Sequence, residues 1–233
     1  MTLRDDRPLK SETFYERLEA LTKSEPEKQA HIGMQRVCEQ DLVLQVATEA
    51  KLSTYIEIGF GNGNLIQKVK KANPNTRVIG FDMAIPEIAC NGIRVLDALA
   101  EEGIDLHIGS IFAEGIFDRA GTKKSFKTMV QEFIESSEGP LMVYTDNGNK
   151  CAELEAVSTH MRAGDICGSH DFLGSPGCRD VIGSTMHNNI EFLGERNFAI
   201  MEQYENYILD HLCLQRFWIK GTEFSGDPTR GVV

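Results

Sequence analysis

Short apolar runs alternate with amphipathic stretches along most of the chain. Five runs have the length and apolar content of buried parallel strands; they are TYIEIGF (54–60), RVIGFD (77–82), IDLHIGS (104–110), PLMVYTD (140–146) and GDICGSHD (164–171). Helical spacing predicts a helix after each of the first four, at residues 61–72, 86–102, 123–137 and 151–161. Strands joined by such helices lie parallel in one sheet. The pattern therefore predicts an α/β fold, a three-layer sandwich around a mainly parallel sheet.

The last third of the chain departs from this alternation. Residues 178–193 predict a further helix, and strands are expected at 198–205 and 212–220. Residues 206–211 between these strands are too few for a crossover helix, so the two strands are expected to pair antiparallel. The sheet would then have seven strands, with an antiparallel strand at one edge.

Two amphipathic helices are predicted before the first strand, at residues 11–22 and 38–50, with the polar stretch 23–29 between them. The first of these helices offers an apolar face that a homo-oligomer could use. We divide the chain into an N-terminal helical extension (1–30), one α/β domain (31–222) and a C-terminal tail (223–233).

Composition narrows the choice of partners and compartment. The chain has 24 Lys and Arg against 35 Asp and Glu, a formal net charge of −11. Most of such a surface repels a nucleic-acid backbone or an anionic membrane, so we expect a small-molecule substrate and neither of those partners. No run approaches the ~18 apolar residues of a membrane span. The six cysteines form no CxxC pair, so they are expected to be reduced thiols of a cytoplasmic protein.

The first strand leads into a turn rich in glycine. Gly59, Gly61 and Gly63 alternate with other residues, and Glu57 lies two positions before the first glycine. Glycines at this point let the backbone come close to a ligand beyond the carboxyl ends of the strands. A dinucleotide fingerprint would need its third glycine at position 64, which is Asn64. The arrangement acid-x-Gly-x-Gly-x-Gly resembles the first motif of class I S-adenosylmethionine-dependent methyltransferases.

This resemblance implies a Rossmann-like methyltransferase sandwich and S-adenosylmethionine as the cofactor. Glu57 would face the cationic ammonium end of the ligand, and Asp82, at the end of the second strand, would hydrogen-bond the ribose hydroxyls. The adenine would be met after the third strand. The residues expected to contact the cofactor are Glu57, Gly59, Gly61, Gly63, Asp82, Met83, Ser110, Ile111 and Asp146.

A second group of polar residues ends the fourth and fifth strands. Asp146 ends the fourth and is followed by Lys150, whereas His170 and Asp171 end the fifth. Adjacent strand ends lie about 5 Å apart, so these side chains should converge beside the cofactor. Two carboxylates and an imidazole at such distances need a positive partner, which either a divalent cation or Lys150 could supply.

A closer resemblance covers roughly residues 30–175. The stretch GMQRVCEQDLVL, the turn EIGFGNGN, the strand-four aspartate followed by Glu153-Leu154, and GD…HD at strand five are similar to the cephalosporin-hydroxylase-type and macrolide or rhamnosyl O-methyltransferases. This resemblance implies a Mg²⁺ or Mn²⁺ ion on Asp146, His170 and Asp171. Catechol-type O-methyltransferases are also similar, with a lysine base that Lys150 could match.

We therefore expect a methyltransferase acting on a small molecule, with a metal that positions the acceptor hydroxyl and with Lys150 or His170 as the base. The expected product class is a modified sugar or natural product. Two alternatives remain open at this stage: a non-catalytic S-adenosylmethionine-binding module and an NAD-dependent oxidoreductase.

Overall fold

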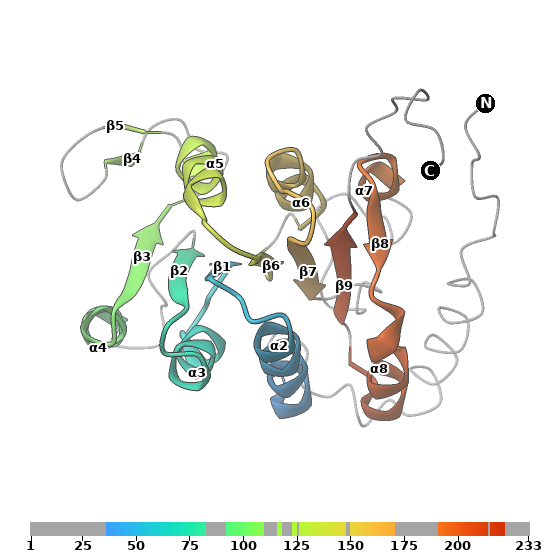
Figure 1. Cartoon of the computed structure of the whole chain (residues 1–233). Coiled ribbons are helices and arrows are strands. Elements are labelled where there is room, and N and C mark those ends of the chain that lie inside the picture. The colour runs from blue at the N-terminus through green and yellow to red at the C-terminus, as the bar shows by residue number, and fades with distance from the viewer. Residues whose placement is uncertain are drawn as a thin grey trace.

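The computed structural model describes residues 36–82, 92–109, 116–117, 123–124, 126–147, 150–170, 191–213 and 215–221. Seven strands form one sheet in the order β3-β2-β1-β6-β7-β9-β8 (Figure 1). They are β1 Thr54–Ile58, β2 Arg77–Asp82, β3 Ile104–Ile108, β6 Leu141–Thr145, β7 Ile166–His170, β8 Phe198–Ile200 and β9 Gln215–Lys220.

The sheet is parallel except for one strand. β1, β2, β3, β6 and β7 pair in parallel, whereas β9 runs antiparallel to both β7 and β8. The α/β class and the mainly parallel sheet predicted from the sequence are therefore confirmed. The reversed strand lies one position in from the edge, because the short β8 adds outside it.

Helices cover both faces of the sheet and complete the three layers (Figure 1). One face carries α2, α3, α4 and α8, and the other carries α5, α6 and α7. Their bounds are α2 Val37–Glu49, α3 Asn64–Ala72, α4 Gly92–Glu101, α5 Phe126–Ser136, α6 Lys150–Ser158, α7 Glu191–Glu195 and α8 Glu205–His211.

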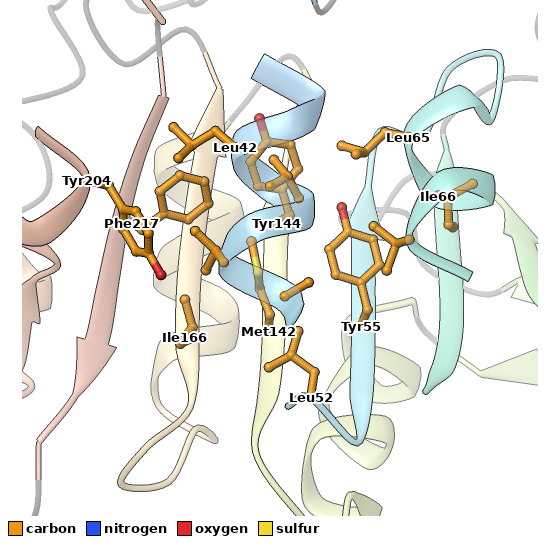
Figure 2. Packing of buried hydrophobic residues seen from close by; sticks show 14 of the residues in the cluster. Leu42, Leu52, Tyr55, Leu65, Ile66, Met142, Tyr144, Ile166, Tyr204 and Phe217 are labelled. Carbon is orange, nitrogen blue, oxygen red and sulfur yellow. The ribbon is translucent and has the colours of Figure 1, made fainter. Parts of the chain in front are cut away.

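Strand alternation divides the core into two clusters, one on each face. Tyr55, Met142, Tyr144 and Phe217 pack with Leu42 of α2 on the first face (Figure 2). Ile56, Ile58, Val143 and Trp218 pack against α5 and α6 on the second. All five residues of β1 and of β6 are buried, which explains why these strands read as continuous apolar runs rather than as alternating patterns.

The expectations for the C-terminal third need correction. The strand expected at 198–205 ends at Ile200, and a 3-10 turn and α8 follow, so a helix fits where the sequence argument had excluded one. The helix forms because Tyr204, Ile208 and Leu209 become buried against the first face of the sheet. β9 begins only at Gln215, since Leu212 adopts a left-handed conformation with φ 50°.

Two other predicted boundaries differ from the structure. The helix expected from residue 123 begins at Phe126, because Lys123–Lys124 (β5) pairs with Ile116–Phe117 (β4) in a separate two-stranded sheet. The helices expected at 11–22 and, up to residue 190, at 178–193 lie outside the described residues.

Ligand position follows from the strand order. β2 and β3 lie on one side of β1, whereas β6 and the later strands lie on the other, so the order reverses between β1 and β6. In sheets of this kind ligands bind outside the carboxyl ends of the strands at this reversal. The loops that follow β1 and β6 are therefore the first place to look for a site.

Candidate functional site

Two glycines of the turn after β1 are required by packing. Gly59 has a φ of 92°, and a Cβ placed on it would lie 2.7 Å from the backbone carbonyl carbon of Asp146. Gly63 has a φ of 76°, and its Cβ would collide with the side chain of Leu99. A side chain at Gly59 would push the turn away from the backbone after β6, whereas one at Gly63 would displace the end of the Leu99 side chain on α4 and strain a left-handed backbone.

The middle glycine differs from the other two. Gly61 has a φ of 51°, yet none of the described residues has an atom within 4 Å of the Cβ position. Its backbone N–H donates to Asp82 Oδ2 over 2.8 Å, so the carboxylate at the end of β2 lies directly against the turn. The predicted pairing of a glycine turn with a carboxylate at the next strand end is therefore present in the structure. This arrangement fits a ribose, whose two hydroxyls need a carboxylate beside an approachable backbone.

Glu57 is buried beneath this turn on the face covered by α2. Its Oε2 accepts a hydrogen bond of 2.9 Å from the hydroxyl of Tyr55. Burial raises the pKa of Glu57 well above its ordinary value of 4.5, and the charges of Asp146 and Asp82 raise the pKa further, although the Tyr55 hydrogen bond opposes them. A cationic ligand nearby would favour the ionised carboxylate, which is the role the sequence predicted for this residue.

The predicted group at the ends of the fourth and fifth parallel strands also converges. His170 Nδ1 lies 3.1 Å from Asp146 Oδ1, and Lys150 Nζ lies 3.9 Å from the same oxygen. Asp146 follows β6, Lys150 begins α6 and His170 ends β7, so three elements supply the group. The imidazole and the ammonium group are buried, whereas 19% of the Asp146 side chain is exposed. Asp146 is therefore the member of the group that a ligand can reach most easily.

The structure adds Glu39, which the sequence analysis did not single out. Glu39 Oε2 lies 3.3 Å from His170 Nε2, on the side of the ring opposite Asp146. The same carboxylate accepts hydrogen bonds from Arg36 at the start of α2, from the backbone N–H over 2.7 Å and from the guanidinium over 3.0 Å. Burial by itself would raise the pKa of Glu39, but the hydrogen bond and charge of His170, together with Arg36, lower this pKa to about 2.

Sequence periodicity alone could not have found this contact. Glu39 lies more than a hundred positions before His170 along the chain, and α2 reads as an ordinary amphipathic helix. An acid three residues after the N-cap is a capping signal, and Glu39 does form a capping box with Arg36. Because capping already explains an acid at position 39, the sequence gives no sign of its contact with His170.

Two of the predicted metal ligands, Asp146 and His170, contact each other in this arrangement. His170 Nδ1 and Nε2 face carboxylate oxygens at 3.1 and 3.3 Å, so a divalent cation on His170 would have to replace one of these contacts. Lys150 and Arg36 already balance the charges of Asp146 and Glu39. Within the described ranges, no group of three or more His, Cys, Asp or Glu residues is arranged to hold a metal ion. Of the proposed ligands, Asp171 lies outside those ranges.

Direct backbone contacts join the two halves of the site. The N–H of Asp146 donates to the carbonyl of Ile58 over 2.7 Å, and Gly59 packs against the peptide between Asp146 and Asn147. The glycine turn and the Asp146 group therefore belong to one edge of the sheet. Met83, Ser110 and Ile111, which were expected on the cofactor, lie outside the described residues.

Comparison with solved structures shows the same fold in other proteins. The O-methyltransferase TomG of Streptomyces achromogenes, solved with S-adenosylmethionine, is 13% identical, with a TM-score of 0.51 over 88% of this chain and 90% of that one. An O-methyltransferase of Bacillus cereus, solved with S-adenosylhomocysteine, is 10% identical, with a TM-score of 0.54 over 88% and 91%. The Podospora anserina methyltransferase PaMTH1, solved with S-adenosylhomocysteine, is 13% identical, with a TM-score of 0.51 over 93% of this chain and 98% of that one.

The family comparison is more specific than the fold. Residues 15–121, which include the glycine turn and Asp82, match the O-methyltransferase domain family. The chain has the fold of these S-adenosylmethionine-dependent methyltransferases. No curated protein matches the chain by sequence. Within the part of the chain that the structure describes, none of the helices is both long and apolar enough to cross a bilayer.

Proposed function

We propose that the protein is a methyltransferase, which transfers a methyl group from S-adenosylmethionine to a hydroxyl of a small molecule. The observation that carries this proposal is the position of Asp146. Its backbone packs on Gly59 of the glycine turn, while its partly exposed carboxylate contacts His170 and Lys150. One residue thus joins the expected donor position to a group of acid–base side chains. The fold and the O-methyltransferase domain match support the same reaction class.

The chemistry requires little beyond geometry and removal of a proton. S-adenosylmethionine, when bound, supplies a methyl on a sulfonium, so transfer forms a C–O bond, breaks a C–S bond and leaves the electron pair on sulfur. Holding two reactants in line can supply ~7–11 kcal/mol of the barrier. The glycine turn and Asp82 would hold the donor, and the Asp146 group would hold the acceptor.

We assign the role of general base to Asp146. Its partly exposed carboxylate would accept the hydrogen bond of the acceptor hydroxyl and take the proton as the C–O bond forms. His170 and Lys150, which the sequence suggested as bases, touch the same carboxylate oxygen from buried positions. In this proposal their positive charges fix the carboxylate and stabilise the negative charge that develops on the acceptor oxygen. No step of this scheme requires a metal ion.

Calorimetry separates the two halves of the site. Asp82→Ala should abolish S-adenosylmethionine binding, because the ribose hydroxyls and the N–H of Gly61 lose their partner. Asp146→Ala should bind S-adenosylmethionine within about threefold of the unaltered protein but lose at least about 100-fold in turnover, in the range of a removed acid–base group. Equal loss of binding in both variants would contradict this division of roles.

An acceptor screen tests the reaction class. S-adenosylmethionine with a ¹³C-labelled methyl would be incubated with catechol, methyl rhamnoside and benzylamine in separate reactions. We expect a labelled O-methyl product from one of the hydroxyl compounds, absent with Asp146→Ala. Label on benzylamine alone would show N-methylation instead. Thermal-shift measurements with S-adenosylmethionine and with NAD give the binding control, and we expect stabilisation only by the former.

A further inference from the structure

The buried carboxylate of Glu39 makes more contacts than helix capping needs. A capping box at the start of α2 would be complete with the hydrogen bonds between Glu39 and Arg36. Only 2% of Glu39 is exposed, and its Oε2 also lies 3.3 Å from His170 Nε2. A buried carboxylate is costly unless its partners are well placed, and His170 is the second partner of Glu39 after Arg36.

The contacts form a continuous series of alternating charges. Arg36 contacts Glu39, Glu39 contacts one nitrogen of His170, the other nitrogen contacts Asp146, and Asp146 contacts Lys150. The two carboxylates favour one orientation of the imidazole ring, because each ring nitrogen lies beside its own acidic neighbour, at 3.1 and 3.3 Å. Without the Glu39 contact, the ring could rotate away from Asp146.

We propose that Glu39 is a positioning residue for methyl transfer: it fixes the imidazole of His170 so that Nδ1 faces Asp146. This inference rests on the proposed function of Asp146. It makes the first turn of α2 a supporting part of the site, although α2 precedes every strand of the sheet. Triads of acid, imidazole and reacting group use the same logic, in which the far carboxylate selects the ring orientation.

The chain offers a matched pair of variants. Glu39→Gln keeps the capping box, since glutamine also accepts from the N-cap N–H, but removes the charge that faces His170. Arg36→Gln breaks the guanidinium contacts with Glu39 and with the carbonyl of Leu212, but leaves the contact between Glu39 and His170. If Glu39 were only structural, the two variants would behave alike.

Turnover and binding are measured for both variants on the acceptor that reacts in the screen, catechol being the first probe. We expect Glu39→Gln to lower kcat at least about tenfold with the Kd for S-adenosylmethionine unchanged, and Arg36→Gln to keep kcat within about threefold while lowering the Tm. The inference is overturned if Glu39→Gln keeps wild-type kcat, or if both variants lose kcat in parallel with Tm.

A second readout needs no acceptor. Nitrogen NMR of the histidine rings, assigned with His170→Gln, reports the surroundings of each ring nitrogen of His170. Glu39→Gln should shift the Nε2 signal, because the charge that faces this nitrogen is lost, whereas Arg36→Gln should leave the signal in place. An unchanged His170 spectrum in Glu39→Gln would contradict the inference. Normal turnover in His170→Gln or Asp146→Ala would instead contradict the proposed function.

Discussion

At the scale of single residues, buried charge distinguishes the candidate site from the rest of the sheet. Glu57 and Glu39 are both buried on the same face of the sheet, yet their pKa values are shifted in opposite directions. Glu39 has Arg36 and His170 as positive partners, whereas Glu57 has a tyrosine hydroxyl and two neighbouring carboxylates. A buried carboxylate with no positive partner among its described contacts is stable mainly in its protonated form.

Glu57 therefore makes stability depend on pH. Its pKa is raised by folding, so the native state binds more protons than the unfolded state once the pH approaches and exceeds the ordinary value of 4.5. Stability is then lost as the pH rises from that value through the folded pKa. Glu57→Gln should remove this loss and so raise the free energy of unfolding at pH 8 relative to that of the unaltered chain.

Urea unfolding at pH 5 and pH 8 checks this expectation. The difference between the two pH values should be smaller in Glu57→Gln than in the unaltered chain. The same variant should bind S-adenosylmethionine more weakly, since it cannot ionise beside the ammonium group. Equal pH dependence in both proteins would mean that Glu57 is ionised in the unliganded fold.

At the scale of elements, the turn between β1 and α3 combines a packing requirement with an open position. Gly59 touches the backbone that follows β6, and Gly63 touches α4 through Leu99, so the turn fixes the spacing of three elements. Gly61 has a positive φ without such a contact among the described residues. The same glycine pattern therefore contains positions with different physical roles.

Alanine at these positions should separate the roles. Gly59→Ala combines an unfavourable φ, which costs about 1–2 kcal/mol, with a collision against rigid backbone, so it should destabilise by at least about 3 kcal/mol or prevent folding. Gly61→Ala has only the φ cost, about 1–2 kcal/mol, but places a methyl where the cofactor is expected. Thermal unfolding and calorimetry with S-adenosylmethionine measure the two effects. Similar unfolding temperatures for the two variants would contradict the distinction.

At the scale of the whole molecule, β9 joins the last part of the chain to the sheet. It pairs with β7 on one side and with β8 on the other, and its Trp218 and Phe217 enter the two opposite core clusters. Gln215, at its start, lies opposite His170 in the strand register, so β9 also forms one wall of the site. The last described strand therefore contributes to both core clusters and joins two other strands of the sheet.

Truncation tests this role. A chain ending at Cys213 lacks β9 and should fail to unfold cooperatively, because β8 loses its only pairing strand among the described residues and both cores lose a large side chain. A chain ending at Gly221 keeps all of β9, and we expect its Tm within about 3 °C of the full chain. Circular dichroism during heating compares the two. A cooperative transition in the shorter chain would contradict the expectation.

The sequence by itself determined the parallel part of the sheet, the glycine turn with Asp82, and the convergence of Asp146 with His170. Continuous apolar runs and glycine spacing act locally, so β1, β2, the glycine turn and Asp82 follow from residues close together in the chain. The carboxyl ends of neighbouring parallel strands meet at one edge, which is why the convergence of Asp146 and His170 could also be predicted.

Only the tertiary structure decided the contacts between distant elements. α8 forms because its apolar side becomes buried on the sheet, and β9 lies inside β8 because both of its edges find partners. Glu39 reaches His170 because α2 packs across the strands that follow it in the chain. Burial and pairing of this kind depend on which distant elements pack together. Periodicity along the chain describes each element by itself and does not determine that packing.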